Sequence, residues 1–432
     1  MQKIAIILLL TVLVFVAGYS FYDLVHTEIQ SGFVQFSIVL IVGFTLIIII
    51  RYITLIYFSI LKNVQKTRDD VEPRICTEKV TILVPAFNEE MVIEASIESL
   101  LVQTYPYIEV LVIDDGSKDR TYEYAKRFEH VDGYKSVKAL TKPNGGKSRA
   151  LNFGIENCSG ELIMVVDADS KLEPDAVELL VQSFTSPEIA AVAGSVSVIN
   201  RGNTWANLQA LEYIEGLNMV RNAQAFLKLV NIIPGPIGMF RRSALEEVGG
   251  YDHDTYAEDC DLTLKLIAEG YKIDFEPDAI AYTEAPEDLL DLIKQRYRWT
   301  RGILQAIRKH KEYLFNWRKR TSTSFVLWYM LFEAIFWPFM DFWSSVFFIY
   351  ISATTGLSSL IVYWWAMFTV LDMAGALYCL LVTKEQLKLV FYAILYRLYF
   401  IGIINVSKIF ATIEEWFNIE MSWGKLERKG RI

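Results

Sequence analysis

Hydrophobic residues are concentrated in two parts of the chain, at positions 4–60 and from about position 324 onward. A membrane-spanning helix needs about 20 apolar residues. Positions 4–19 and 33–60 therefore predict two N-terminal spans, and positions 324–350 and 358–382 predict two more. The next apolar stretch, 389–411, is interrupted by Arg397 and is either a fifth span or an interfacial or re-entrant segment.

Basic residues beside the spans predict which side of the membrane the central part occupies. The connector 22–31 has no Lys or Arg, whereas Lys62, Lys66, Arg68 and Arg74 follow the second apolar run. Positive flanks stay on the cytoplasmic side, so we expect a multi-pass protein of the plasma or inner membrane with a cytoplasmic central domain. A signal peptide is the alternative for residues 4–19, although its small-residue cleavage site is poor.

The central part alternates short hydrophobic runs with amphipathic stretches, which is typical of βα units around a mainly parallel sheet. We expect strands at 80–87, 109–114, 137–140 and 161–169, with helices at 90–102 and 119–129. Ligands of such sheets lie beyond the carboxyl ends of the strands. Polar clusters follow all four strands, which predicts one assembled site there. The clusters are 88–90, 114–117, 145–147 and 167–169.

Charge and cysteine usage narrow the class of protein. The net charge is −9, with 42 Lys and Arg against 51 Asp and Glu. A nucleic-acid-binding protein normally has a basic surface, so we expect no nucleic-acid partner. The four cysteines show no C-x-x-C spacing and there are only four histidines. Neither a zinc site nor a disulfide framework is therefore predicted.

Two carboxylates, Asp167 and Asp169, flank a small residue directly after a buried strand. They repel each other unless a cation lies between them. Hard oxygen ligands suit Mg²⁺ or Mn²⁺, which also bridges substrate phosphates. The structural alternative is a strand-to-turn cap made of two Asp residues. Together with the other clusters at the strand ends, this pair of carboxylates predicts a metal site.

The second and third clusters predict contacts to a nucleotide. Asp114 and Asp115 precede a Gly-Ser turn and are either turn residues or nucleoside contacts. Lys147 follows two glycines and opens a helical stretch, so its ammonium and the helix N-terminus can both face a diphosphate. A Walker A loop would need glycine where Thr141 stands. We therefore do not expect nucleotide hydrolysis of that type.

Two helical stretches carry further candidate residues. Glu258, Asp259 and Asp261 open an amphipathic helix, where acidic residues also occur simply because they favour helix N-termini. Within residues 295–302, Gln295, Arg298 and Trp299 are related by three- and four-residue steps and share one helix face. Trp stacks on sugars and Arg clamps phosphate. The alternative is an interfacial helix whose Trp and Arg anchor at lipid headgroups.

Taken in order, these motifs resemble the processive family-2 inverting glycosyltransferases, which include hyaluronan, chitin-oligosaccharide, cellulose and poly-N-acetylglucosamine synthases. The resemblance runs from about residue 80 to residue 302 and covers VPAFNEE, IDDGSKDRT, NGGKSRALN, DADS, GPIGMFRR, AED and QRYRW. It implies an α/β GT-A domain with a Rossmann-like mixed sheet, placed between transmembrane helices. The expected units are 1–62 with two spans, 78–280 as the GT-A domain, 281–322 with interfacial helices and the QxxRW motif, and 323–432 with the C-terminal spans and basic tail.

The resemblance also implies roles for individual residues. Glu258 and Asp259 match the catalytic acids, with Asp259 as the general base. Asp167 and Asp169 match the metal ligands. The expected contacts to the nucleotide sugar are Pro85, Asn88, Glu89, Asp114, Asp115, Lys147 and Asp167, and the expected acceptor and diphosphate clamp is Gln295, Arg298 and Trp299.

Size and span arrangement are most similar to the bacterial poly-β-1,6-N-acetylglucosamine synthases. This similarity predicts a β-glycosyltransferase that polymerises sugar from a UDP-sugar, with UDP-GlcNAc as the favoured donor, and exports the polysaccharide of a biofilm, with or without a small accessory membrane subunit. Hyaluronan and chitin-oligosaccharide synthases are close alternatives. A non-processive transferase that glycosylates polyprenyl phosphate is a further alternative, and an inactive transporter or scaffold is disfavoured by the retained Asp259.

The third apolar span contains acidic residues, which are costly in a membrane and usually face protein or water. Glu333, Trp337 and Asp341 repeat at four-residue steps and lie on one helical stripe. We expect this stripe to line a polysaccharide channel that opens beside Trp299. Helix–helix contacts by the same residues are the alternative.

Overall fold

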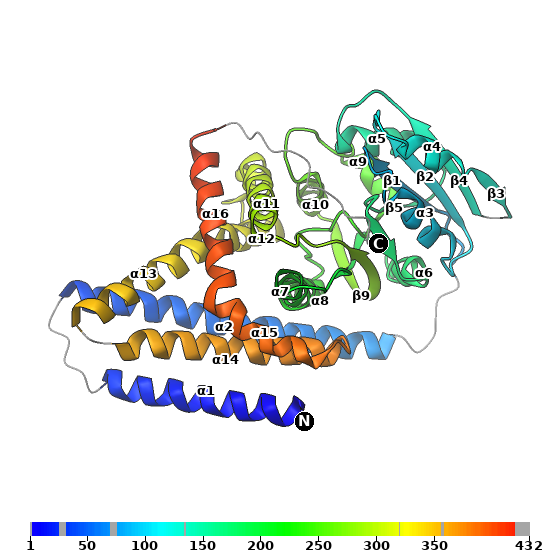
Figure 1. Cartoon of the computed structure of the whole chain (residues 1–432). Coiled ribbons are helices and arrows are strands. Elements are labelled where there is room, and N and C mark those ends of the chain that lie inside the picture. Colours follow the sequence, from blue (N-terminus) through cyan, green and yellow to red (C-terminus); the bar gives the residue numbers. More distant parts are fainter. Residues whose placement is uncertain are drawn as a thin grey trace.

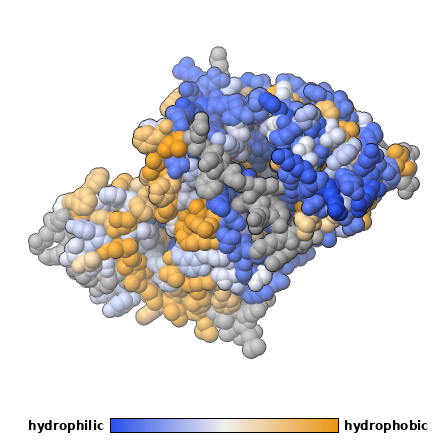
Figure 2. All heavy atoms as spheres, turned by 45° about the horizontal axis from the view of Figure 1, so that its top comes forward, coloured by the Kyte–Doolittle hydropathy of each residue, from blue (hydrophilic) through white to orange (hydrophobic). Residues whose placement is uncertain are grey.

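The computed structural model describes residues 2–25, 32–69, 76–133, 135–318, 320–355 and 358–419. The basic tail at 425–431 and Arg74 lie outside this part of the chain. An α/β domain and a layer of long helices make up the described structure (Figure 1). Hydrophilic side chains cover the domain, whereas hydrophobic side chains gather over the helical layer (Figure 2).

One nine-stranded sheet forms the centre of the α/β domain, in the order β3-β4-β2-β1-β5-β8-β7-β9-β6. Strands β1, β2, β4 and β5 run parallel, as the sequence predicts, whereas β8 is antiparallel to both of its neighbours. The sheet is therefore mixed. The strands are β1 (Val80–Ala86), β2 (Ile108–Asp114), β3 (His130–Asp132), β4 (Lys135–Thr141), β5 (Leu162–Val165), β6 (Ser170–Leu172), β7 (Ile189–Val198), β8 (Gly238–Arg241) and β9 (Lys272–Thr283).

Helices cover both faces of the sheet, because strands β1 and β2 are apolar on both faces and must be buried on both. One face packs against α3 (Ile93–Leu101), α4 (Thr121–Lys126), α6 (Ala176–Gln182) and α7 (Thr204–Glu212). The other packs against α5 (Lys147–Asn157), α9 (Arg242–Glu247), α10 (Glu258–Glu269), α11 (Leu289–Lys309) and α12 (Thr321–Leu331).

Four helical segments of the described chain are long and apolar enough to cross a membrane: Gly32–Lys66, Thr321–Thr354, Ile361–Val382 and Leu387–Trp416. They comprise α2 (Gly32–Asp69), α12 with η3 (Phe332–Phe336) and α13 (Trp337–Thr355), α14 (Ser358–Val382), and η4 (Leu387–Phe391), α15 (Tyr392–Leu395), η5 (Tyr396–Phe400) and α16 (Ile401–Trp416). The N-terminal helix α1 (Gln2–Val25) packs along α14. Helices α1, α2 and α14 lie side by side (Figure 1).

The segment that the sequence leaves open, 389–411, is not one straight helix. Its last part, α16, runs crosswise to α2 and α14 (Figure 1) and packs along α11. Polar contacts hold the two helices together: Arg301 Nε donates to Glu415 (2.7 Å), and the Tyr297 hydroxyl pairs with Glu414. Pairing with a polar, amphipathic helix favours the interfacial interpretation of α16.

A polar network lies between the membrane helices. The Arg397 guanidinium pairs with both carboxylate oxygens of Asp372 (2.7 and 3.0 Å). The Tyr52 hydroxyl lies 3.1 Å from Asp372 and 2.9 Å from Glu215, which belongs to the π-helical turn η1 (Tyr213–Met219). This network joins η1 of the α/β domain to the membrane helices α2 and α14.

The acidic stripe of the third span takes part in helix–helix contacts. Glu333 pairs with Arg51 (2.6 Å), whose guanidinium also lies 4.8 Å from the centre of the Trp337 ring. Asp341 accepts a hydrogen bond from Asn405 (2.8 Å). These contacts agree with the alternative expectation, in which the stripe residues hold neighbouring helices together. A polysaccharide channel along the stripe remains a proposal.

Candidate active site

The carboxyl ends of the parallel strands meet at one edge of the sheet, and the loops that follow them are tied together. Asp115, after β2, accepts hydrogen bonds from the backbone N–H groups of Gly145 (3.0 Å) and Gly146 (2.7 Å) and pairs with Lys142 (2.6 Å). Asp114 accepts from Thr141 (2.8 Å). Both carboxylates are buried and hold the loop before α5 against β2.

The loop after β1 is tied to the same region. Pro85 stands opposite Ile113 in the sheet, close to the end of β1. The Asn88 backbone N–H donates to the Ser117 hydroxyl (2.9 Å), and the Asn88 side chain accepts from the Lys118 N–H (2.8 Å). The predicted nucleoside contacts therefore lie in two interlaced loops.

Lys147 is the central cation of the site. It opens α5, and its ammonium lies 2.6 Å from an Asp167 oxygen and 3.1 Å from a Glu258 oxygen. Burial lowers the pKa of Lys147, but Asp167 and Glu258 outweigh it and hold this pKa well above its ordinary value. The ammonium therefore stays charged and joins the loop after β5 to the first residue of α10.

Gly235 opens the GPIGMFRR stretch, which contains β8, and packs against the site. A Cβ atom at this position would lie 2.9 Å from both an Asp167 oxygen and the Lys147 ammonium, so no larger residue fits without displacing them. Asp169, two residues after Asp167, is buried at the same turn. Two hard carboxylates at one turn are ligands that suit a divalent cation with phosphate oxygens.

Asp259 lies on the first turn of α10, beside this cluster. Burial and the neighbouring Glu258 raise its pKa to about 6, although Lys147 opposes them. Its Oδ1 accepts a hydrogen bond from the Cys260 N–H (2.7 Å). A carboxylate with a pKa near the working pH is suited to accept a proton during a reaction.

The QxxRW residues lie on α11, and the structure separates them by exposure. Gln295 is buried, Trp299 is half-buried against Tyr213, and Arg298 is exposed. Within the described residues, Arg298 makes no hydrogen bond or ion pair. Its neighbour Arg296 is instead the buried one: it bonds to Gln295 (2.6 Å) and stacks over the Trp299 ring at 4.3 Å.

Arg296 was not identified from the sequence, although it belongs to the same motif. Its guanidinium also pairs with Glu212 (2.5 Å), at the end of α7. The sequence QRYRW does not indicate which of its two arginines is buried. The packing of α11 against α7 and η1 determines which one faces inward. Arg296 therefore fixes the Trp299 ring, and Arg298 is left available to a ligand.

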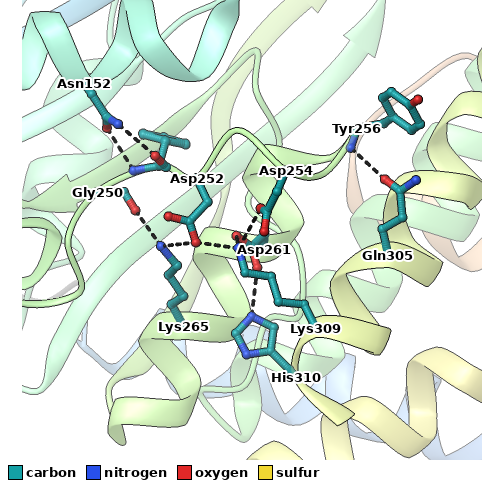
Figure 3. A network of polar contacts seen from close by, with 11 residues as sticks. Asn152, Gly250, Asp252, Asp254, Tyr256, Asp261, Lys265, Gln305, Lys309 and His310 are labelled. Atoms are coloured by element: carbon teal, nitrogen blue, oxygen red, sulfur yellow. Dashed lines mark hydrogen bonds and ion pairs between the residues drawn. The ribbon is translucent and has the colours of Figure 1, made fainter.

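A network behind the site holds α10 against α11 (Figure 3). The Asp261 carboxylate pairs with Lys309 (2.9 Å) and His310 (2.8 Å), both at the end of α11. Burial raises the pKa of Asp261, but these two partners outweigh it and lower the pKa. Gly302 allows the close approach, since a Cβ atom there would lie 2.6 Å from that of Ala257. Asp261 is thus a structural residue of α10.

The carboxylates of Asp252, Asp254 and Asp261 lie close enough together to suggest a second cation site (Figure 3). The Lys309 ammonium, however, bonds to all three of them. Lys265 also pairs with Asp252 (2.7 Å), so two ammonium groups already hold these carboxylates together without a metal ion.

A solved structure with the same fold comes from an archaeal enzyme. The mannosyltransferase of Pyrobaculum calidifontis, determined with GDP-Man and Mn²⁺, superposes with a TM-score of 0.58, at 19% identity, over 86% of this chain and 98% of that one. The mixed sheet with its strand-end site is thus a GT-A fold, the architecture of nucleotide-sugar glycosyltransferases.

The sequence is also similar to known glycosyltransferases. Residues 81–249 match the family model for glycosyl transferase family 2. The poly-β-1,6-N-acetyl-D-glucosamine synthase of Staphylococcus epidermidis is 33% identical over 226 residues, or 52% of this chain and 54% of that protein. The synthase of Staphylococcus aureus strain COL is 31% identical over 259 residues, 60% and 61% of the two chains. The matched part thus spans little more than half of these relatives.

The raised pKa of Asp259 predicts an acid limb in the pH profile of transfer. The reactive form is the carboxylate, so kcat/KM should rise with pH through an apparent pKa of about 6. Replacing Lys147 with Met removes the cation that opposes the shift, so any residual activity should show its acid limb at higher pH. Initial rates measured from pH 4.5 to 8 test this; a limb near the ordinary value for aspartate would contradict it.

Proposed function

We propose that this protein is a membrane-embedded, inverting β-glycosyltransferase that adds N-acetylglucosamine from UDP-GlcNAc to a growing polysaccharide. The observation that carries the proposal is the convergence of Lys147, Asp167 and Glu258 beside Asp259. The arrangement offers a charged diphosphate site and a proton acceptor side by side. The staphylococcal relatives, named as poly-β-1,6-N-acetyl-D-glucosamine synthases, support the donor and the product.

The reaction is a single displacement. An acceptor hydroxyl attacks the anomeric carbon of the donor while the bond to the nucleoside diphosphate breaks, which inverts an α-linked donor to a β product. Asp259 accepts the hydroxyl proton. Lys147 and Arg298 stabilise the negative charge on the departing diphosphate. Trp299, fixed by Arg296, holds the terminal sugar of the acceptor.

Asp167 and Asp169 are the residues that would hold a divalent cation, Mg²⁺ or Mn²⁺. When bound, such an ion supplies positive charge that stabilises the leaving diphosphate. The fit rests on the hard carboxylate oxygens and on the close approach of the backbone to Asp167 that Gly235 allows. The Mn²⁺ named for the archaeal mannosyltransferase supports the choice of metal.

We further propose that the domain faces the cytoplasm and that the polymer leaves through the membrane helices. Lys62 and Lys66, at the end of α2, pair with Asp274 and Glu276 of β9, which anchors the basic end of this span to the domain. The contacts of Glu333 and Asp341 must rearrange to open a route along α12 and α13, or an accessory membrane subunit completes it.

Asp259→Asn should lower the turnover at least about a hundredfold, because general-base catalysis contributes about 10²–10⁴ to a rate. Binding of UDP-GlcNAc should stay nearly unchanged, since the amide keeps the volume of the side chain. Asp254→Asn is the matched control, because Asp254 is an exposed carboxylate in the loop before α10. Substantial turnover by a folded Asp259→Asn preparation would remove this residue from the base role.

Chelation should stop the transfer, and added Mg²⁺ or Mn²⁺ should restore it. Asp169→Ala should lose metal-dependent binding of UDP-GlcNAc, whereas the exposed carboxylate of Asp175 can be replaced by Ala without effect. Equilibrium binding with and without metal, together with product formation, measures both. Undiminished activity in excess chelator would exclude the metal from the reaction.

Export can be tested in sealed vesicles with the domain facing outward and UDP-GlcNAc supplied outside. Polymer should accumulate in the lumen, protected from added glycosidase, because a carbohydrate crosses hydrocarbon only through a polar route. Vesicles that also contain candidate accessory subunits form the second arm. The proposed route is wrong if all of the polymer remains digestible from outside in both arms.

A further inference from the structure

A cavity of about 160 Å³ lies between the α/β domain and the membrane helices. Its walls come from α2, η1, α8 (Val220–Phe226), α11, α12, η3 and α16. The volume equals that of about five water molecules, which is the scale of a single sugar unit rather than of a nucleotide. Most of its polar wall is made by Arg221, Gln224, Asn231, Thr300, Glu333 and Lys408.

Arg221 of α8 is unusual among the buried arginines. Arg296, Arg301 and Arg397 each hold a carboxylate within 2.5 to 2.7 Å. Arg221 is only 8% exposed, yet within the described chain its guanidinium makes no hydrogen bond or ion pair, and its Nη1 is completely buried. An unpartnered buried guanidinium is costly, so a ligand that accepts hydrogen bonds would account for its place.

The surroundings of Arg221 indicate what that ligand is. Asp259 and Tyr213 are the groups that interact with its charge, and Tyr213 also packs against Trp299. Burial lowers the pKa of Arg221 to about 10, so it remains a cation at neutral pH. The guanidinium thus lies near Asp259 and Tyr213, and the Arg221 side chain also lines the cavity.

We propose that Arg221 is an acceptor-binding residue: its guanidinium donates hydrogen bonds to oxygens of the saccharide unit that enters this cavity beside Asp259. A guanidinium has five N–H donors and no acceptor, so its partners are hydroxyl or amide carbonyl oxygens of the sugar. This inference rests on the proposed function. It assigns the acceptor site to a residue outside the QxxRW motif.

Equilibrium binding of an N-acetylglucosamine oligosaccharide to the full-length protein, without donor, tests this role directly. Arg221→Gln should weaken oligosaccharide binding about tenfold or more, the usual effect of losing a hydrogen bond to a charged group. UDP binding should stay unchanged, and in turnover the acceptor KM should rise more than kcat falls. Arg221→Lys should recover part of the loss, because it restores the charge.

Arg241→Gln is the matched control. Its half-buried guanidinium bonds to backbone carbonyls at the start of β7 and in the loop before it, lies over the Phe184 ring, and is not among the residues that line the cavity. This variant should bind the oligosaccharide as the unchanged protein does, and UDP binding verifies that each variant is folded.

Two outcomes would overturn the assignment of Arg221. Unchanged oligosaccharide binding by a folded Arg221→Gln protein, with binding intact in the unsubstituted protein, would overturn this inference alone. Absence of both oligosaccharide binding and transfer in the unsubstituted protein would overturn the proposed function as well.

Discussion

The site depends on one ion pair network, in which a single ammonium holds carboxylates from two separate elements. Asp167, Asp169, Glu258 and Asp259 would repel one another if they converged without a cation. Lys147 bridges Asp167 and Glu258, and so fixes the loop after β5, the start of α5 and the start of α10 relative to one another. Burial, together with the same repulsion from Glu258, explains the raised pKa of Asp259, and the repulsion also explains why a divalent ion fits beside Asp167.

From this network, contacts lead through the domain to the membrane helices. The pair of Asp261 with Lys309 and His310 fixes α10 on α11. Arg296 connects α11 to Glu212 at the end of α7, directly before η1. The η1 turn then reaches α2 and α14 through Glu215 and Tyr52. The proposed acceptor site therefore lies where these contacts connect the α/β domain to the membrane helices.

Much of the first half of the domain could be predicted from the sequence, because its βα units are local and their apolar runs are continuous. Strands β1, β2, β4 and β5 and helices α3 and α4 were predicted correctly within a few residues. Strands β6 to β9 were not, since they pair with residues far apart in the chain, β7 with β9 in parallel and β6 and β8 antiparallel to their neighbours. The π-helical turn η1 has no local pattern that distinguishes it from an ordinary α-helix.

The candidate site shows the same division. Clustering of Asp167, Lys147 and Glu258 followed from motifs at the strand ends and at a helix start. The inward position of Arg296, the close approach at Gly235 and the unpartnered state of Arg221 depend on long-range packing. No residue pattern predicts these three features, although the glycine that opens GPIGMFRR is a sequence signal for a close approach of the backbone.

The proposed transfer of N-acetylglucosamine from UDP-GlcNAc to a polysaccharide is best tested by analysing the products formed from single donors. Purified protein in lipid should be incubated separately with UDP-GlcNAc, UDP-glucose and UDP-glucuronic acid, and the products digested with linkage-specific glycosidases. We expect a polymer to form from UDP-GlcNAc and from neither of the other two donors. An enzyme specific for β-1,6-linked N-acetylglucosamine should cleave this polymer. A polymer from another donor, or only a lipid-linked monosaccharide, would contradict it.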